Sequence, residues 1–213
     1  MLPLSGGEVI FSRQPWKTKG RRSNNCYAYA VNSYKSYRTK KSVPGDVSGL
    51  SKLPHTYTHC RDLKRRVISD NPKKIYNVKP QTKCKKDYFK IMMFVAPEKN
   101  SLFGYGDFHF YKQHGKVKYT VRKGDTQKSI AEKFKIPLNR VRKHAPLTRG
   151  KTIMLNVNMW SHKLGWATGP LLSDSCGKVI KDPRKACRKY SHNYKTYCNS
   201  FCVKNKGIKV GNT

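Results

Sequence analysis

The sequence predicts an α+β protein in which an early helix packs on an antiparallel sheet and a compact βααβ unit is inserted into that sheet. Three observations predict this architecture. Ser23-Asn24-Asn25 is a helix start, because Ser and Asn side chains accept hydrogen bonds from the free N–H groups of a helix. Strand-forming residues fill 88–96 and 102–113. Residues 118–157 contain two short strands that enclose two short helices.

The helices of the main part of the chain are expected at three places. The first follows the asparagine start over residues 26–34 and is apolar on most sides, which indicates burial. The second covers residues 60–69 and is ended by Asp70-Asn71-Pro72, because proline cannot continue a helix. A third is expected over residues 184–190, whereas residues 193–203 are mixed and aromatic and receive no assignment.

These elements divide the chain into four parts. We expect a basic arm, a discontinuous main domain, an inserted unit and a tail, at residues 1–22, 23–115 with 159–205, 116–158, and 206–213. No run approaches ~18 consecutive apolar residues, so no transmembrane helix is predicted. The first ten residues are too short and too glycine-rich for a secretion signal, so conventional export is not expected.

The chain is strongly basic. It has 46 Lys and Arg against 11 Asp and Glu, a formal net charge of +35, spread over the whole length. Something anionic must screen this self-repulsion, and the candidates are nucleic acid, an acidic membrane surface, cell-wall polyanions and acidic partner proteins. A lysine-rich solvated surface is the simpler interpretation and stays open. No motif for base recognition is present, so any binding of nucleic acid is expected to be non-specific.

Seven cysteines add a constraint on redox state. Their odd number leaves at least one thiol free if the others pair. Without a secretion signal, a reducing compartment with free thiols is the default expectation. The spacing of the C-terminal cysteines fits no common paired-CxxC zinc pattern. We therefore expect neither a metal nor a cofactor.

The inserted unit carries a specific motif. It reads Tyr119-Thr120-Val121, Gly124-Asp125-Thr126 and Ser129-Ile130-Ala131, followed by Phe134 and later by a Gly-x-x-Ile segment at 150–153. Together with the βααβ order, this pattern strongly resembles the LysM domain. The resemblance implies binding to N-acetylglucosamine polymers, such as peptidoglycan or chitin, in a groove beside the Gly-Asp-Thr turn.

The LysM resemblance also implies which residues line that groove. They are Gly124, Asp125, Thr126 and Ile130 on one side and Ala145, Pro146 and Leu147 on the other. His144 stands where the family usually has Asn, and the loop that follows it is short. A LysM fold used as a protein-interaction or spacer module therefore remains an alternative.

Three residues of the main domain have the types and the order of a catalytic set. Cys26 lies in the first turn of the predicted helix, where the positive helix end favours a thiolate. His109 lies in the middle of a predicted strand, and His162 lies in the predicted strand 159–163. Without the inserted unit, only a short loop separates the two histidines. We therefore expect them on adjacent antiparallel strands that face the helix bearing the cysteine.

This order of elements resembles the papain-like fold, and especially its compact NlpC-type branch. The fuller pattern also looks like uncharacterised bacterial and giant-virus proteins. The resemblance implies a cysteine peptidase or amidase with Cys26 as the nucleophile, His109 as the general base and His162 as the residue that orients it. Tyr29 and Trp160 would line the cleft. Two alternatives stay open, namely Asp107 as the orienting group, and a buried cysteine with two core histidines and no catalytic role.

Three functions follow from these patterns. The first is a cell-wall hydrolase, in which the LysM module keeps the substrate close and which is carried in the particle of a large DNA virus. The second is a non-catalytic minor capsid or virion structural protein of the same fold, with its basic surface against nucleic acid, membrane or acidic capsid proteins. The third is a non-specific nucleic-acid condensing protein. The expected location is the virion, or otherwise the cytoplasm.

Overall fold

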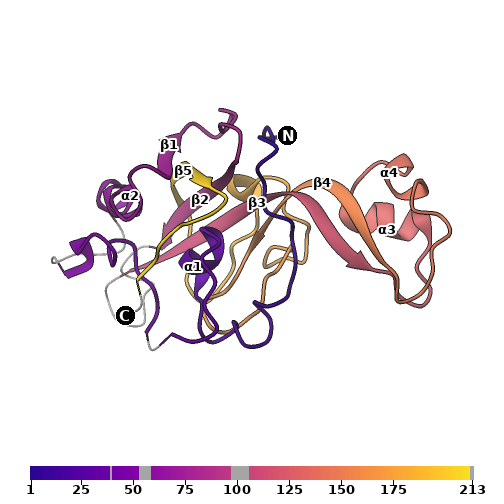
Figure 1. Cartoon of the computed structure of the whole chain (residues 1–213), viewed down its shortest axis with the longest axis horizontal. Helices are drawn as coiled ribbons and strands as arrows, with labels where there is room; N and C mark the ends of the chain where they lie inside the picture. Colours follow the sequence, from indigo (N-terminus) through magenta and orange to yellow (C-terminus); the bar gives the residue numbers. More distant parts are fainter. Residues whose placement is uncertain (39, 53–58, 97–105, 212–213) are drawn as a thin grey trace.

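The computed structural model describes residues 1–38, 40–52, 59–96 and 106–211. At its centre is an antiparallel sheet of five strands in the order β1-β5-β2-β3-β4 (Figure 1). The strands are β1 (Ile75–Val78), β2 (Tyr88–Ala96), β3 (Asp107–Thr120), β4 (Thr152–His162) and β5 (Thr196–Lys204). The predicted α+β class is confirmed. The first four residues of the predicted strand 102–113 lie outside the described residues.

Four α-helices accompany the sheet: α1 (Cys26–Ala30), α2 (Cys60–Ser69), α3 (Gln127–Phe134) and α4 (Asn139–Arg142). Helix α1 begins as predicted, with the Asn25 side chain accepting a hydrogen bond from the Ala28 N–H at 3.1 Å. It ends at Ala30, and Asn32 adopts a left-handed backbone with φ 58°. The predicted extension of this helix to residue 34 was therefore wrong, whereas α2 covers the residues expected of it.

The two faces of the sheet carry different apolar clusters. The cluster on one face joins α1 and α2 to alternate residues of β2 and β3, including Ile91, Met93, Phe108 and Phe110. The cluster on the other face contains Met92, Phe94, Tyr111, Trp160 and Tyr194. This division follows from strand geometry, because successive side chains point to opposite faces.

Strands β3 and β4 are long enough to belong to two cores. They pair from Tyr111 with His162 to Thr120 with Thr152, and so run without a break from the central sheet into the βααβ unit, which projects at one end of the molecule (Figure 1). That unit has its own apolar cluster, and Phe11 and Met159 are part of it. The Lys181 ammonium also donates to the Phe134 carbonyl at 3.0 Å. Two continuous strands and additional packing therefore join the unit to the sheet.

Both ends of the chain are packed, which corrects the expectation of a separate arm and tail. Leu2, Phe11 and Trp16 are buried, and the Leu2 carbonyl accepts hydrogen bonds from the side chains of Gln113 and Asn158. At the other end, Val210 is buried against the cluster that contains α1.

The C-terminal third of the chain differs most from the prediction. The helix expected over 184–190 is only a short 3₁₀ helix, η3 (Pro183–Lys185). The segment left without an assignment contains β5, which lies between β1 and β2 and pairs with both. Within the described ranges, no helix has the length and apolar character needed to cross a bilayer.

Six of the seven cysteines form disulfides, so the default expectation of free thiols was wrong. The pairs are Cys60–Cys198, Cys84–Cys202 and Cys176–Cys187. The expectation rested on the missing secretion signal, which carries no information on which cysteines meet in the fold. The odd count did predict a free thiol, and that thiol is Cys26.

Candidate functional site

The Gly-Asp-Thr turn of the βααβ unit is held by its own hydrogen bonds. Gly124 has φ +82°, a left-handed conformation that glycine adopts without a steric penalty. The Asp125 carboxylate accepts from the Tyr119 hydroxyl and from the Arg122 N–H, both at 2.6 Å. Desolvation acts to raise the pKa of Asp125, but these hydrogen bonds outweigh it and lower the pKa. Asp125 is thus a charged residue whose hydrogen bonds hold the turn in its conformation.

Helix α3 begins directly after this turn with a capping box. The Thr126 hydroxyl accepts from the Ser129 N–H at 3.0 Å, and the Ser129 hydroxyl accepts from the Thr126 N–H at 2.9 Å. Two free N–H groups of the helix start are satisfied in this way. The turn and the helix start therefore form one rigid piece.

The opposite loop is tied to the same turn by backbone hydrogen bonds. Val121 donates to the Lys151 carbonyl and Gly150 donates to the Val121 carbonyl, each at 2.9 Å. Ala145 and Pro146 are exposed beyond this connection, as a groove wall requires, while Leu147 is half-buried against the unit's core.

Of the seven predicted groove residues, Ile130 has a different role. Its side chain is 0% exposed and belongs to the apolar cluster of the unit. Helix periodicity places it on the core face of α3, so its side chain is not available to a ligand at the surface of the unit.

The two predicted histidines meet on neighbouring strands. Nε2 of His109 lies 2.9 Å from Nδ1 of His162, and the strands that carry them pair antiparallel, as expected from the sequence. The remaining ring nitrogen of His162, Nε2, is 3.0 Å from the Ser173 carbonyl oxygen. Burial lowers the pKa of both imidazoles, for His162 to about 4. Both rings are therefore neutral near pH 7.

The hydrogen bonds fix the tautomers of this pair. A carbonyl oxygen only accepts, so Nε2 of His162 carries its proton and Nδ1 is the acceptor. Nε2 of His109 must then donate to that acceptor, and Nδ1 of His109 holds a free lone pair. A neutral imidazole with an unprotonated Nδ1 is the state that a general base needs.

A group of tyrosines surrounds the imidazoles. Tyr194 stacks on His109 with 4.8 Å between ring centres, and its hydroxyl donates to Asp107 at 2.6 Å. The hydroxyl of Tyr190 lies 3.3 Å from Nε2 of His162. Asp107 thus contacts Tyr194, and its effect on His109 is indirect.

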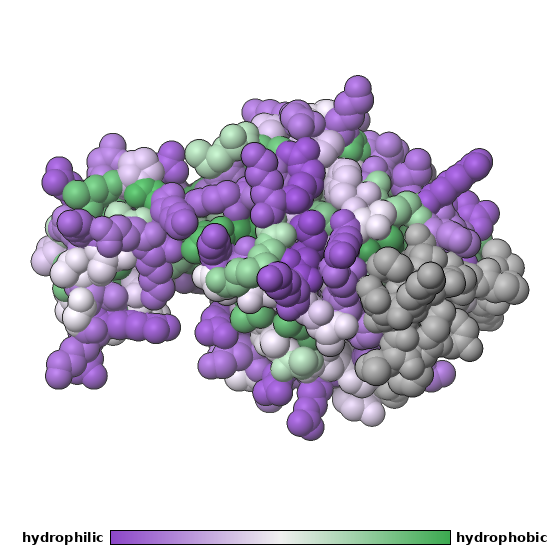
Figure 2. Space-filling view, turned by 180° about the vertical axis from the view of Figure 1, so that it is seen from behind, coloured by the Kyte–Doolittle hydropathy of each residue, from purple (hydrophilic) through white to green (hydrophobic). Residues whose placement is uncertain are grey.

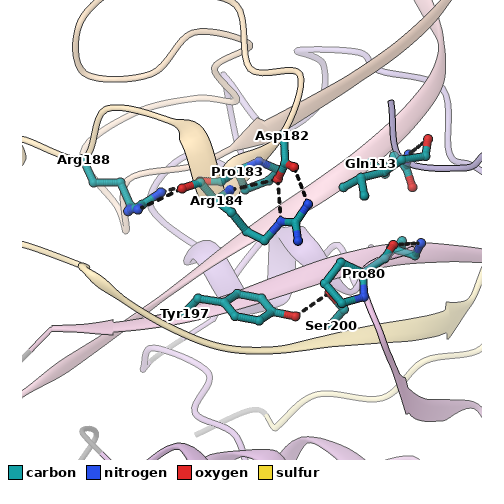
Figure 3. A network of polar contacts seen from close by, with 10 residues as sticks. Pro80, Gln113, Asp182, Pro183, Arg184, Arg188, Tyr197 and Ser200 are labelled. Carbon is teal, nitrogen blue, oxygen red and sulfur yellow. Dashed lines mark hydrogen bonds and ion pairs between the residues drawn. The ribbon is translucent and has the colours of Figure 1, made fainter. Parts of the chain in front are cut away.

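The segment that supplies Tyr190 and Tyr194 is irregular and anchored by polar contacts (Figure 3). Asp182 accepts from the Arg184 guanidinium at 2.5 and 3.0 Å, and Arg188 donates to the Pro183 carbonyl. In the neighbouring strand β5, the Tyr197 and Ser200 hydroxyls are 2.9 Å apart. Sequence reasoning missed the partners of both histidines because such a segment has no periodicity to read.

The Cys26 thiol contacts the strand that carries His109, but Cys26 lies on the other face of the sheet from the imidazole pair. It packs with Phe108 and Phe110 in the cluster on the α1 face, whereas His109, between them in β3, points to the opposite face. The thiol donates to the Phe108 carbonyl at 3.6 Å. The expectation that both histidines face the helix was therefore wrong, because alternation along β3 separates them from α1.

The Cys26 thiol is also poorly suited to ionise in this position. Its residue is 5% exposed, and burial raises the pKa of the thiol to about 12, with a further contribution from Asp107. The N–H of Phe110 and the ammonium of Lys163 act in the opposite direction and are outweighed. The helix N-terminus alone does not produce a thiolate here.

The two residues predicted to line a cleft are both buried. Tyr29 is 1% exposed, and its hydroxyl lies 2.6 Å from the Ser161 hydroxyl, which in turn lies 2.6 Å from Nε2 of His114. Trp160 is 0% exposed. Both side chains lie in the packed interior of the domain. They are therefore part of its core and cannot line an open cleft.

No three or more His, Cys, Asp or Glu side chains come together in a way that could hold a metal ion, in the part of the chain that the structure describes.

Comparison with known families identifies one part of the chain. The family described as LysM domain matches residues 119–144. A comparison with curated proteins and one with solved structures each found no match. The matched residues hold the rigid Gly-Asp-Thr turn and both helices of the βααβ unit. Residues 119–144 are therefore a LysM domain, a module that binds glycans such as peptidoglycan.

Proposed function

We propose that this protein binds N-acetylglucosamine polymers, peptidoglycan or chitin, at the surface between the turn Gly124–Thr126 and the loop Ala145–Leu147. The observation that carries the proposal is the connection of the turn in the matched LysM residues to the loop that follows directly after them. Their hydrogen bonds through Val121, Gly150 and Lys151 hold both walls in place before any ligand arrives. A preformed site loses little conformational entropy on binding.

Binding by the full chain to insoluble peptidoglycan and chitin tests this function. The variant Ala145→Gln enlarges an exposed side chain of the proposed groove, and Ala167→Gln makes the same change at an exposed position outside the LysM unit. We expect Ala145→Gln to weaken binding roughly tenfold, since the loss of one good contact is worth about 1.4 kcal/mol. Equal binding by wild type and Ala145→Gln would contradict the proposed groove.

A second candidate function is that of a papain-like cysteine peptidase or amidase. The observation that favours it is the tautomer of His109, which leaves Nδ1 unprotonated on the same strand whose backbone the Cys26 thiol contacts. Because the sheet separates the thiol from His109 in this structure, reaction requires a rearrangement that brings the Cys26 sulfur to Nδ1 of His109, which then takes the thiol proton. The sulfur then attacks the peptide carbonyl carbon, the leaving amine takes the proton, and water hydrolyses the thioester.

Hydrolysis of peptidoglycan stem peptides, followed by the release of amino groups, tests this second candidate. Cys26→Ala and His109→Gln should each abolish the release. Release that continues at the wild-type rate in Cys26→Ala would exclude a cysteine mechanism. Binding of peptidoglycan without any hydrolysis would leave the glycan-binding function as the whole activity.

The proposal extends to where the protein acts. A net charge of +35 supports a position against anionic material, and we propose the particle of a large DNA virus, where the same fold would serve as a hydrolase or as a non-catalytic minor capsid component. Nucleic acid, a membrane surface or acidic capsid proteins would screen the charge. Retention of the protein by stripped particles in low salt, and its release in high salt, is the expected result.

A further inference from the structure

Exposed basic side chains stand on both sides of the proposed glycan groove. Arg122 and Lys123 belong to the turn that carries Gly124, and Lys143 and Arg149 flank the opposite loop. All four side chains are exposed. The backbone hydrogen bonds of Val121 with Gly150 and Lys151 join the chain next to Arg122 to the chain next to Arg149. We call these four residues the basic rim.

Little negative charge offsets the basic rim. The matched LysM residues 119–144 contain eight Lys and Arg but only two acidic residues, Asp125 and Glu132. The Asp125 carboxylate is engaged with Tyr119 and the Arg122 N–H. Glu132 lies on the side of α3 that faces Leu138, together with Lys128 and Lys135. No ion pair involves a residue of 119–151 within the described ranges.

The surface of the LysM unit is correspondingly hydrophilic. Figure 2 shows the projecting lobe with hydrophilic side chains extending from most of its outline. A neutral sugar polymer gains nothing from the charge of such a rim. A glycan with carboxylates along its length would place them within a Debye length of several cations, where attraction is not yet screened at physiological salt.

We propose that the basic rim makes this LysM domain selective for carboxylate-bearing glycan strands over neutral N-acetylglucosamine polymers. The inference rests on the proposed glycan-binding function and deepens it by naming the class of substrate. The neutral sugars would occupy the groove between the two segments, and the carboxylates that branch from alternate sugars would lie against Arg122 and Lys123 on one side and Lys143 and Arg149 on the other.

Three soluble probes test the selectivity with the full chain: a neutral hexamer of N-acetylglucosamine, peptidoglycan glycan strands with free carboxylates, and the same strands with their carboxylates converted to methyl amides. At low salt we expect the carboxylated strands to bind roughly tenfold more tightly than either neutral probe, a ratio that two or three exposed ion pairs can supply. The ratio should fall toward one as the salt concentration reaches ~1 M, where the Debye length is about 3 Å.

Variants locate the effect. Lys143→Gln with Arg149→Gln should reduce the preference at least threefold and leave binding of the neutral hexamer unchanged. Lys128→Gln with Lys135→Gln removes the same charge from the side of α3 that faces Leu138 and serves as the matched control. An equal effect of the two double variants would overturn the inference, because the preference would then come from overall charge.

The outcomes also separate this inference from the proposed function. Binding of the neutral hexamer without any preference for carboxylates would overturn the inference alone. If neither glycan bound, the proposed function would fail as well. If duplex DNA competed for the protein as well as the carboxylated strands do, the basic rim would be a general polyanion-binding surface. That result would also overturn the inferred selectivity.

Discussion

Nε2 of His109 and Nδ1 of His162 are 2.9 Å apart, and this contact joins two rings that are both buried and neutral. The Ser173 carbonyl sets the direction of the hydrogen bonds, since it accepts only from a protonated Nε2 of His162. A catalytic pair and a purely structural pair would share this geometry. Their difference lies in whether the Cys26 thiol can reach Nδ1 of His109.

The buried imidazoles predict a loss of stability in mild acid. Burial lowers the pKa of His162 to about 4 and of His114 to about 3, and lowers that of His109, whereas unfolded histidines titrate near 6.5. The unfolded chain therefore binds more protons below pH 6.5, and stability falls as pH decreases from about 6.5 toward 4. His162 and His114 should each cost about 2 kcal/mol between pH 7 and 5.

Urea unfolding at pH 7 and pH 5 measures this loss. In His162→Gln the decrease should be smaller than in wild type by about 2 kcal/mol, because one proton-binding group of the unfolded chain is gone. His144 lies in the LysM unit, outside the imidazole pair, so His144→Gln is the control and should keep the wild-type decrease. An unchanged pH dependence in His162→Gln would mean that the imidazole is accessible to protons in the native state.

The Cys26 thiol should react slowly in the native protein. With burial raising its pKa to about 12, its thiolate fraction at pH 8 is about 10³-fold below that of an ordinary cysteine. Alkylation by iodoacetamide, followed by mass spectrometry, should therefore be slow in buffer and fast in urea. Rapid alkylation of the folded protein at pH 7 would contradict the buried resting state and would support the hydrolase.

The disulfide Cys176–Cys187, in which Cys176 is exposed and Cys187 is half-buried, should control the order of His162. It closes the segment between Ser173 and Tyr190, which are the two partners of Nε2 of His162. Replacing both cysteines by serine should cost about 3 kcal/mol by chain entropy, against about 5 kcal/mol for the longer loop closed by Cys84–Cys202.

An NMR titration of the double serine variant reports on His162 directly. The pKa of His162 should rise from about 4 toward 6.5 as water enters, because burial is the main cause of the low pKa and outweighs the contact with the Ser173 carbonyl, which by itself raises the pKa. A pKa that stays near 4 in the folded variant would show that the sheet alone holds the ring.

The sequence predicted local features better than long-range ones. The ends of α2 and β2, the Asn25 cap and the LysM turn depend on neighbouring residues, and each was found where expected. Strand β5 was missed because its place between β1 and β2 depends on pairing with residues more than a hundred positions away.

The candidate site shows the same limit. The histidine pair was predictable, because adjacent strands with a known insertion fix which residues face each other. The face on which Cys26 packs was not, since a helix after a loop can cover either side of a sheet. Helix position and strand alternation together decide whether a thiol and an imidazole meet; the place of the helix along the chain was read correctly, whereas the face of the sheet that it covers was not.

Lys112 provides the last prediction, because it is a buried cation with neutral partners. Its ammonium donates to the Tyr29 carbonyl at 2.9 Å and to Asn32 at 3.2 Å, and lies 3.9 Å from the centre of the Tyr29 ring. Burial lowers the pKa of this lysine to about 7, whereas in the unfolded chain it titrates near 10.4. The unfolded state therefore holds more protons between about pH 7 and 10.

Stability should consequently rise by about 2 kcal/mol between pH 7 and 9, as the native ammonium loses its proton and the cost of its burial disappears. Lys112→Met should lack this rise, while Lys118→Met, at an exposed position of the same strand, should retain it. Chemical unfolding at the two pH values measures both. A rise that persisted in Lys112→Met would assign the effect to another buried amine, for which Lys163, with a pKa lowered to about 8 by burial, is the next to test.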